Sequence, residues 1–305
     1  MPPFQPQRLL VTTDFSAESK RALPLAAQLA ERFGSEVDLL YVFEPPPRFA
    51  GTESLLLMPE PKAVREELEA GLVALARSVF PPSVKVTPHL RPGKPVPKIL
   101  RAARELKADA LIMATHGYSG LQHALLGSVT ERVVRRAPCP VLAVRGDSRR
   151  GSKRTPPPDS VGHILLATDF SKNARTAFPQ AVSLARLWGA ELTLVYVVQR
   201  FPLDALLGTE VTRNTAAILS EQGKIELTEL ARSLSSTEGL KIGTQVCFGQ
   251  PFQEITRIAE DLNVGLIVLA THGHTGIRHA YLGSVAERVV QHASCPVLVV
   301  PALKS

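Results

Sequence analysis

A long internal repeat constrains the fold of this chain more than any other feature of its sequence. Residues 11–16 read Val-Thr-Thr-Asp-Phe-Ser, and residues 166–171 read Leu-Ala-Thr-Asp-Phe-Ser. The segment Ala-Thr-His-Gly occurs at residues 114–117 and again at residues 270–273. Both pairs are separated by about 155 positions, so the chain consists of two copies of one unit of nearly equal length.

The stretch between the two copies is basic and rich in proline, and it shows no apolar periodicity. Such a composition is typical of a semi-extended linker. We therefore expect a first domain over residues 1–146, a linker over 147–160 and a second domain over 161–305. A chain of 305 residues is long enough for two domains of common size, each with its own core.

The two copies do not match evenly along their length. Residues 8–42 and 114–144 stay close to their counterparts, whereas residues 44–92 and 199–248 have diverged strongly. Two copies under no constraint would diverge in sequence at a similar rate along their whole length. Either packing or function therefore preserves the residues of the matching segments.

Apolar segments of strand length alternate with segments of helical periodicity in both copies. This alternation predicts two tandem, doubly wound, Rossmann-like α/β domains, each with a five-stranded parallel sheet covered on both faces. The expected helices of the first copy cover residues 16–33, 62–79, 96–106 and 129–136. The expected strands are 8–13, 37–43, 84–90, 110–114 and 141–144, and then 164–168, 192–198, 242–247, 266–270 and 297–300.

The first helix carries signals for its start, its interior and its end. Ser16 is suited to cap it, and Gly34 is suited to end it. Pro24 lies inside it and removes one backbone hydrogen bond, so we expect a kink there. Pro179 repeats this feature in the second copy.

The segments that match best converge on one edge of the predicted sheet. Right-handed crossovers place the carboxyl ends of all parallel strands at the same edge, where open α/β sheets bind ligands. Asp14 follows the first strand, and the Thr-His-Gly segment at residues 115–117 follows the fourth. The aspartate can extend the helix cap beside Ser16, but its position at this edge favours a function.

Each copy also has a Gly-Ser pair at the start of a predicted helix. Gly127-Ser128 stands nine residues after Gly117, and Gly283-Ser284 repeats this spacing. A helix N-terminus presents N–H groups and partial positive charge to an anion, and glycine allows close backbone approach. Gly-Ser before a helix is also an ordinary cap. The whole pattern of strand, Thr-His-Gly, nine residues and Gly-Ser is more specific and indicates a phosphate site.

This pattern resembles the nucleotide-binding signature of the universal stress protein family, Gly-x-x-Gly, nine residues, then Gly-Ser or Gly-Thr. The similarity covers both halves almost end to end and includes Cys-Pro-Val-Leu before the fifth strand. It implies a tandem protein with the adenine nucleotide alpha hydrolase-like fold. In ATP-binding members of the family the aspartate meets the ribose, the glycine-rich loop and the serine hold the phosphates, and backbone near the end of the second strand meets the adenine.

Carried over to this sequence, the resemblance implies a nucleotide site in one or both copies. We expect no protein metal site. The expected first site comprises Thr13, Asp14, Val42, Ala114, Thr115, His116, Gly117, Gly127, Ser128 and Val129. The expected second site comprises Thr168, Asp169, Val197, Ala270, Thr271, His272, Gly273, Gly283, Ser284 and Val285. In both copies alanine replaces the first glycine of the signature, at Ala114 and Ala270. Alanine fits there if φ is negative, whereas a ligand packed against it would meet an extra methyl group.

Catalysis is not indicated by the sequence. His116 and His272 have no carboxylate or cysteine partner at metal-ligand spacing, so we favour loop histidines over metal ligands or acids. The sequence contains no P-loop, no zinc-protease motif and no nucleophile elbow. Tyr41 and Tyr196 are ordinary strand residues, and their rings are equally suited to stack against an adenine base.

Composition argues against a disulfide-rich, a nucleic-acid-binding and a membrane protein. Three cysteines without a C-x-x-C pair cannot make a disulfide framework and are expected as small buried thiols. The net charge is +7, but basic clusters are confined to the linker, which favours a solvated tether over a nucleic-acid arm. Apolar runs stop short of the roughly 20 residues that cross a bilayer, and no secretory signal begins the chain. We expect a cytoplasmic protein without membrane contact.

Together these features predict a regulatory binding module of the stress response. ATP, with or without Mg²⁺, is expected in the two domains and to alter contact with an unidentified protein partner. The resemblance also implies that the domains pair through their fifth strands, 141–144 and 297–300, and that the chain doubles as a homodimer. A slow ATPase and a nucleotide-free interaction protein of the same fold stay open as alternatives.

Overall fold

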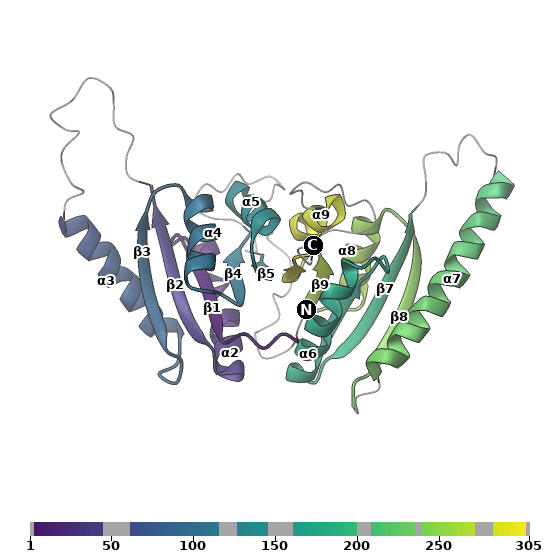
Figure 1. Cartoon of the computed structure of the whole chain (residues 1–305), viewed down its shortest axis with the longest axis horizontal. Coiled ribbons are helices and arrows are strands. Elements are labelled where there is room, and N and C mark those ends of the chain that lie inside the picture. The colour runs from purple at the N-terminus through teal and green to yellow at the C-terminus, as the bar shows by residue number, and fades with distance from the viewer. Residues whose placement is uncertain are drawn as a thin grey trace, which may run out of the picture.

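The described part of the chain forms one continuous sheet flanked by helices (Figure 1). Its ten strands follow the order β3-β2-β1-β4-β5-β10-β9-β6-β7-β8. The computed structural model describes residues 3–44, 62–115, 127–145, 161–199, 209–235, 239–271 and 283–302. The predicted linker lies outside the described residues.

Each copy contributes five parallel strands and its own helices, which confirms the predicted fold class. The elements of the first copy are β1 (Arg8–Thr13), α1 (Ala17–Lys20), α2 (Leu23–Phe33), β2 (Glu36–Phe43), α3 (Lys62–Val79), β3 (Val86–Pro92), α4 (Pro95–Glu105), β4 (Ala110–Ala114), α5 (Ser128–Arg136) and β5 (Val141–Val144). Those of the second copy are β6 (His163–Ala167), the 3₁₀ helix η2 (Ala174–Ala177), α6 (Phe178–Trp188), β7 (Glu191–Gln199), α7 (Thr209–Ser235), β8 (Ile242–Gly249), α8 (Pro251–Asp261), β9 (Leu266–Ala270), α9 (Ser284–His292) and β10 (Val297–Val300).

The predicted kinks at the two prolines are wrong. Pro24 stands in the first turn of α2, and a separate short helix, α1, precedes it. Pro179 stands in the first turn of α6, after η2. Proline suits a first turn because an N–H there has no partner within the helix. The prolines therefore start new helices. The expected cap is confirmed, since the Ser16 hydroxyl accepts the N–H of Ser19 at 3.1 Å.

The two copies join through their fifth strands, as the resemblance implies. Strand β5 pairs antiparallel with β10, and Leu142 stands opposite Leu298 at the centre of the pairing. Each strand thereby covers the edge that its partner would expose. Leu142 and Leu298 belong to the same buried apolar cluster, which includes residues of both copies.

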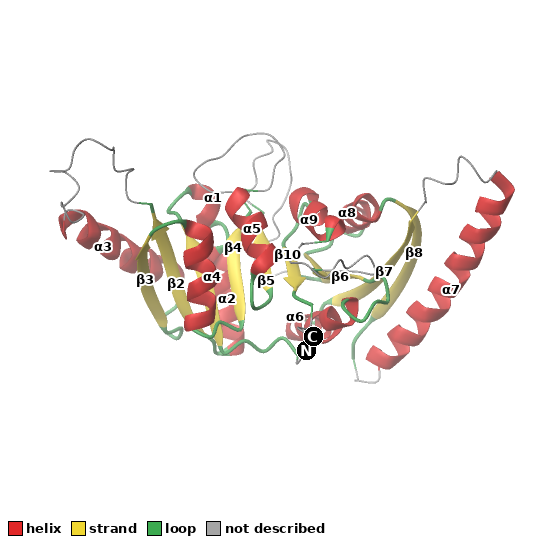
Figure 2. Ribbon diagram, turned by 45° about the horizontal axis from the view of Figure 1, so that its top comes forward, coloured by secondary structure: helices red, strands yellow, loops and turns green. Residues whose placement is uncertain are grey.

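Two apolar cores lie on opposite faces of the sheet and extend through both copies. One contains buried side chains from α2, α3, α6 and α7, and the other contains side chains from α4, α5, α8 and α9. Figure 2 shows how these helices flank the sheet. The long helices α3 and α7 lie at the two outer ends of the molecule, and α5 and α9 lie side by side near its middle (Figure 1).

Polar contacts add to the junction between the copies. The hydroxyl of Ser183 donates to the carbonyl oxygen of Phe4 at 2.8 Å, where the N-terminal segment crosses to the second copy. Arg145 donates to two carbonyl oxygens at the C-terminal end of α9, at 3.1 and 2.8 Å. Arg135 of α5 lies 3.5 Å from Glu287 of α9. The junction therefore combines sheet pairing, a shared core and several hydrogen bonds.

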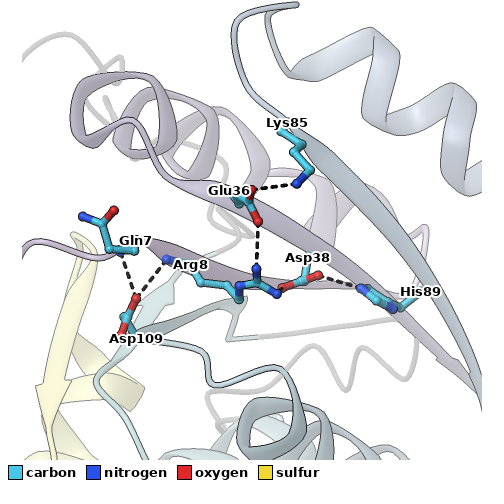
Figure 3. A network of polar contacts seen from close by, with 7 residues as sticks. All are labelled: Gln7, Arg8, Glu36, Asp38, Lys85, His89 and Asp109. Carbon is cyan, nitrogen blue, oxygen red and sulfur yellow. Dashed lines mark hydrogen bonds and ion pairs between the residues drawn. The ribbon is translucent and has the colours of Figure 1, made fainter.

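The first copy contains a polar network in the N-terminal half of its sheet (Figure 3). Asp38 of β2 has only 5% of its side chain exposed and lies 2.6 Å from Nε2 of His89 and 3.7 Å from Arg8. Glu36 joins Arg8 at 2.8 Å and Lys85 at 2.7 Å at the surface. This network stands away from the carboxyl ends of the strands, so it supports the fold and not the candidate site.

Candidate functional site

The turn after the first strand of each copy is built in the same way. The N–H of Phe15 donates to the Thr13 hydroxyl at 3.1 Å, and the N–H of Ser16 donates to Oδ1 of Asp14 at 3.0 Å. Phe15 has a φ of 63°, a conformation that is uncommon for a bulky side chain. The side chains of the threonine and the aspartate hold this turn in place.

The second copy repeats this turn closely. Phe170 has a φ of 63°, and its N–H donates to the Thr168 hydroxyl at 3.0 Å. The N–H of Ser171 donates to Oδ1 of Asp169 at 3.0 Å. Both aspartates therefore have a fixed position at the carboxyl edge of the sheet, as predicted, and each also takes part in the local turn.

The helices α5 and α9 begin beside the ends of β4 and β9. The N–H of Gly127 donates to the carbonyl oxygen of Thr115 at 2.9 Å, and the N–H of Gly283 donates to that of Thr271 at 2.7 Å. The glycine occupies the cap position in both helices, so the following serine is the first helical residue. The Gly-Ser pair is thus an ordinary helix start with glycine at the cap, and the same start presents the free N–H groups that a phosphate site requires.

The first turn of α9 is suited to an anion. The N–H groups of Ser284, Val285 and the next residue have no partner within the helix, because the first intrahelical bond is donated by Glu287 to Gly283. These groups carry the positive end of the helix dipole. The Ser284 hydroxyl stands beside them.

A cleft of 720 Å³ opens at the carboxyl edge of the second copy. This volume lies in the range of small-molecule sites. All predicted residues of the second copy that the structure describes line it: Thr168, Asp169, Val197, Ala270, Thr271, Gly283, Ser284 and Val285. His272 and Gly273 lie outside the described residues. The structure therefore brings the predicted second site together in one concave surface.

The residues of the first site stand on corresponding elements. Thr13 ends β1, Val42 lies in the neighbouring strand β2, Ala114 ends β4, and Thr115 is hydrogen-bonded to the start of α5. Asp14 follows β1, and Gly127, Ser128 and Val129 form the start of α5. His116 and Gly117 lie outside the described residues. The same framework thus exists twice.

The alanines that replace the first signature glycine do not strain the backbone. Ala114 and Ala270 are the last residues of β4 and β9. Among the described residues other than glycine, only Phe15, Lys107, Phe170 and Asn263 have a positive φ. An extended backbone accepts alanine freely, so the substitution leaves the strand ends intact. The methyl group of Ala270 borders the cleft.

Comparison with known proteins agrees with this geometry. The sequence pattern of the Universal stress protein family matches residues 6–145 and 161–301. The chain belongs to the universal stress protein family. Universal stress protein E of Escherichia coli strain K12 is 25% identical over 313 residues, which cover 96% of this chain and 93% of that protein.

Other universal stress proteins match a single copy or the fold. Universal stress protein MJ0531 of Methanocaldococcus jannaschii is 36% identical over 137 residues, which are 45% of this chain and 80% of that protein. The crystal structure of a universal stress protein from Archaeoglobus fulgidus has a TM-score of 0.67 and 22% identity, and covers 97% of this chain and 96% of its own. The tandem arrangement is therefore shared with known members of the family.

One wall of the cleft in this universal stress protein was not predicted from the sequence. Gln222, Gly223 and Glu226 of α7 line the cleft together with Tyr196 and Phe170. The rings of Phe170 and Tyr196 lie 4.8 Å apart. A signal was present, since Leu-Ala-Arg-Ser occurs at residues 75–78 and again at 230–233 and aligns α3 with α7.

The cleft is electrostatically negative on this side. Burial raises the pKa of Tyr196, and the nearby carboxylates of Glu226 and Asp169 raise it further. In the first copy burial and Asp14 raise the pKa of Tyr41. Both tyrosines therefore stay protonated at neutral pH.

The described residues contain neither a protein metal centre nor an activated thiol. Within the described ranges, no three His, Cys, Asp or Glu side chains are grouped so as to hold a metal ion. Cys139, Cys247 and Cys295 are free and buried, as predicted. Burial raises the pKa of Cys139 and of Cys295 to about 12. Across the same residues, every helix is too short or too polar to span a bilayer.

Proposed function

We propose that this universal stress protein binds adenine nucleotides, ATP foremost, at the carboxyl edge of each copy and acts as a regulatory binding module in the response to stress. The observation that carries this proposal is the cleft of 720 Å³ in the second copy, because all eight described residues of the predicted site line it. These residues were expected together from a sequence signature and not from the shape of the cleft.

The groups around the cleft suit the parts of a nucleotide. The Asp169 carboxylate accepts hydrogen bonds from ribose hydroxyls. The first N–H groups of α9 and the Ser284 hydroxyl donate to phosphate oxygens. Backbone at Val197 in β7 meets the base, and Ala270 borders the space between them. In the first copy the same roles fall to the counterparts Asp14, Ser128, Val42 and Ala114.

These interactions are sufficient for useful affinity. A micromolar dissociation constant corresponds to about −8 kcal/mol. Three hydrogen bonds to charged groups at roughly 1.5–3 kcal/mol each, together with burial of the base, supply this after the cost of association. Mg²⁺ would arrive on the phosphates, because it prefers phosphate oxygens and water with one or two carboxylates.

Bound nucleotide would regulate a protein partner by changing the surface that this partner contacts, and not through a catalysed reaction. The nucleotide would contact the turn after β6 and the start of α9, and α9 lies beside α5 of the other copy (Figure 1). A bound nucleotide can therefore affect the junction of the two copies and a protein partner that recognises it. A homodimer of the tandem chain is part of this proposal.

Isothermal titration with ATP and Mg²⁺ tests the proposal. We expect Asp169→Ala to weaken binding in the second cleft about tenfold or more, because a charge-assisted hydrogen bond to the ribose is lost. The matched control is Asp261→Ala, since Asp261 is 59% exposed on α8 and pairs only with Arg257 among the described contacts. The proposal is wrong if the wild-type chain binds no adenine nucleotide, or if both variants lose affinity equally.

A further inference from the structure

At one position of the wall formed by α7, the second copy has a carboxylate where the first copy has glycine. In the first copy a carboxylate of the corresponding helix, Glu67, stands at the position of Gln222, about one turn earlier. Helices α3 and α7 align through Leu72 and Leu227, which are 1% and 0% exposed and which both stand three residues before Leu-Ala-Arg-Ser. In this alignment Glu226 of α7 takes the position of Gly71 in α3. The two copies therefore differ at a residue that lines the cleft.

Glu226 and Asp169 reach the cleft from different elements. Both line it, one from α7 and the other from the turn after β6, and the charges of both act on the Tyr196 hydroxyl. Nε2 of Gln222 donates to Oε1 of Glu226 at 3.2 Å. This hydrogen bond orients the Glu226 carboxylate, which is only partly exposed to solvent.

Gly223 brings α7 close to this side of the cleft. A Cβ atom at Gly223 would lie 2.5 Å from Cδ1 of Tyr196, so the ring packs directly against the helix backbone. Residues 223 and 226 lie about one turn apart and share one side of the helix. The counterpart of Gly223 in the first copy is Leu68, which has a side chain where Gly223 has none.

The chemistry of this wall favours ligand groups that donate hydrogen bonds. Ionised carboxylates accept hydrogen bonds and cannot donate them. None of the described residues that line the cleft is a lysine or an arginine. Two carboxylates on different elements can each accept one hydroxyl of a neighbouring pair, which a ribose presents and a deoxyribose does not.

We propose that Glu226 is a specificity-determining residue of the second cleft, where with Asp169 it selects ligands that carry two adjacent hydroxyl groups, as in a ribonucleotide. This inference rests on the proposed nucleotide function. It makes the nucleotide sites proposed for the two copies unequal, because the second discriminates between ATP and dATP more strongly than the first.

Competitive photolabelling of the full chain measures each cleft separately. The protein is labelled with an ATP analogue that carries an azide on the base, in the presence of increasing ATP or dATP. After digestion the label is counted in peptides of each copy. In the second copy we expect half-maximal competition to require about tenfold or more dATP than ATP. This is the effect of losing one hydrogen bond to a charged group. In the first copy we expect a ratio several-fold smaller.

Two variants test the role of the side chain. Glu226→Ala is expected to lower the ATP-to-dATP ratio of the second cleft to that of the first, and labelling of the first copy reports that the chain is folded. Glu229→Ala, at an exposed position of the same helix, is expected to leave the ratio unchanged. An unchanged ratio in Glu226→Ala overturns the inference. If ATP displaces no label from either copy, the proposed function itself fails.

Discussion

The N–H of Gly283 donates a hydrogen bond of 2.7 Å to the carbonyl oxygen of Thr271, and the pair joins the end of β9 to the start of α9. Gly127 and Thr115 make the same bond at 2.9 Å in the first copy. The bond uses backbone atoms only, so it fixes the helix start against the strand end whatever side chains lie between. The conserved spacing between the Thr-His-Gly segment and the Gly-Ser pair therefore places the start of the helix beside the end of the strand in both copies.

Gly283→Pro tests this bond, because proline lacks the N–H and suits the φ of −60° at this position. We expect a loss of about 1–3 kcal/mol in the free energy of unfolding, measured in urea, because the hydrogen bond that joins α9 to the end of β9 is removed. Gly283→Ala keeps the N–H and serves as the control. Equal stability of the two variants would contradict the role of the bond.

The close contact of Tyr196 with α7 predicts opposite outcomes for two Gly→Ala changes. Gly223→Ala places a methyl group 2.5 Å from Cδ1 of Tyr196 and should destabilise the protein by about 1–3 kcal/mol. Gly71→Ala meets the Phe15 ring only at 3.8 Å and should stabilise α3 by up to about 1 kcal/mol, since alanine is the better helix former. Thermal unfolding separates the two, and a shift of the same sign in both would refute the contact.

The buried network of the first copy makes a second comparison possible. Asp38→Ala should cost about 1–3 kcal/mol, because it removes the buried carboxylate that is hydrogen-bonded to the partly buried His89 and pairs with Arg8. Glu36→Ala removes a carboxylate that is 41% exposed and should cost less than about 1 kcal/mol. Chemical denaturation of both variants measures the difference. Similar losses would show that the burial of Asp38 adds nothing.

The raised pKa values of two buried cysteines lead us to expect that the free energy of unfolding falls at alkaline pH. The folded pKa of Cys295 is about 12, whereas the ordinary value is 9.0, and burial is the main cause. The folded state therefore keeps a proton that the unfolded state releases, so this contribution is complete below pH 9.0 and disappears as the pH rises towards about 12. Cys139 behaves alike.

The variant Cys139→Ala/Cys295→Ala should accordingly lose less stability than the wild type between pH 9.0 and about 12. The measurement is the free energy of unfolding at a series of pH values. Parallel curves for the two proteins would show that the thiols do not titrate in this way.

The sequence alone predicts most of the framework because the features that define it are local. A buried strand such as β4 is a continuous apolar run, and the predicted and observed bounds agree. Asp169 and Ser284, which both line the cleft, could be singled out as candidates because each stands at a strand end or helix start that recurs in the other copy. With the first helix excepted, the predicted ends of helices and strands lie within two residues of the observed ones.

What the sequence did not predict depends on packing between distant segments. The proline in α2 has the same sequence signal whether it bends one helix or begins another, and only the position of α1 decides. The wall made by Gly223 and Glu226 belongs to a region that has diverged between the copies, so the repeat gave little guidance. The contact between Gly223 and Tyr196 joins α7 to β7 and has no local signature.

The measurement that tests the central claim most directly is the nucleotide content of the purified chain. The protein is denatured, and the released small molecules are identified by chromatography and mass spectrometry, before and after incubation with ATP. We expect the wild type to release adenine nucleotide and Asp169→Ala to release less. If no adenine nucleotide is released even after incubation, and ATP does not shift the unfolding temperature, the cleft of the second copy is not a nucleotide site.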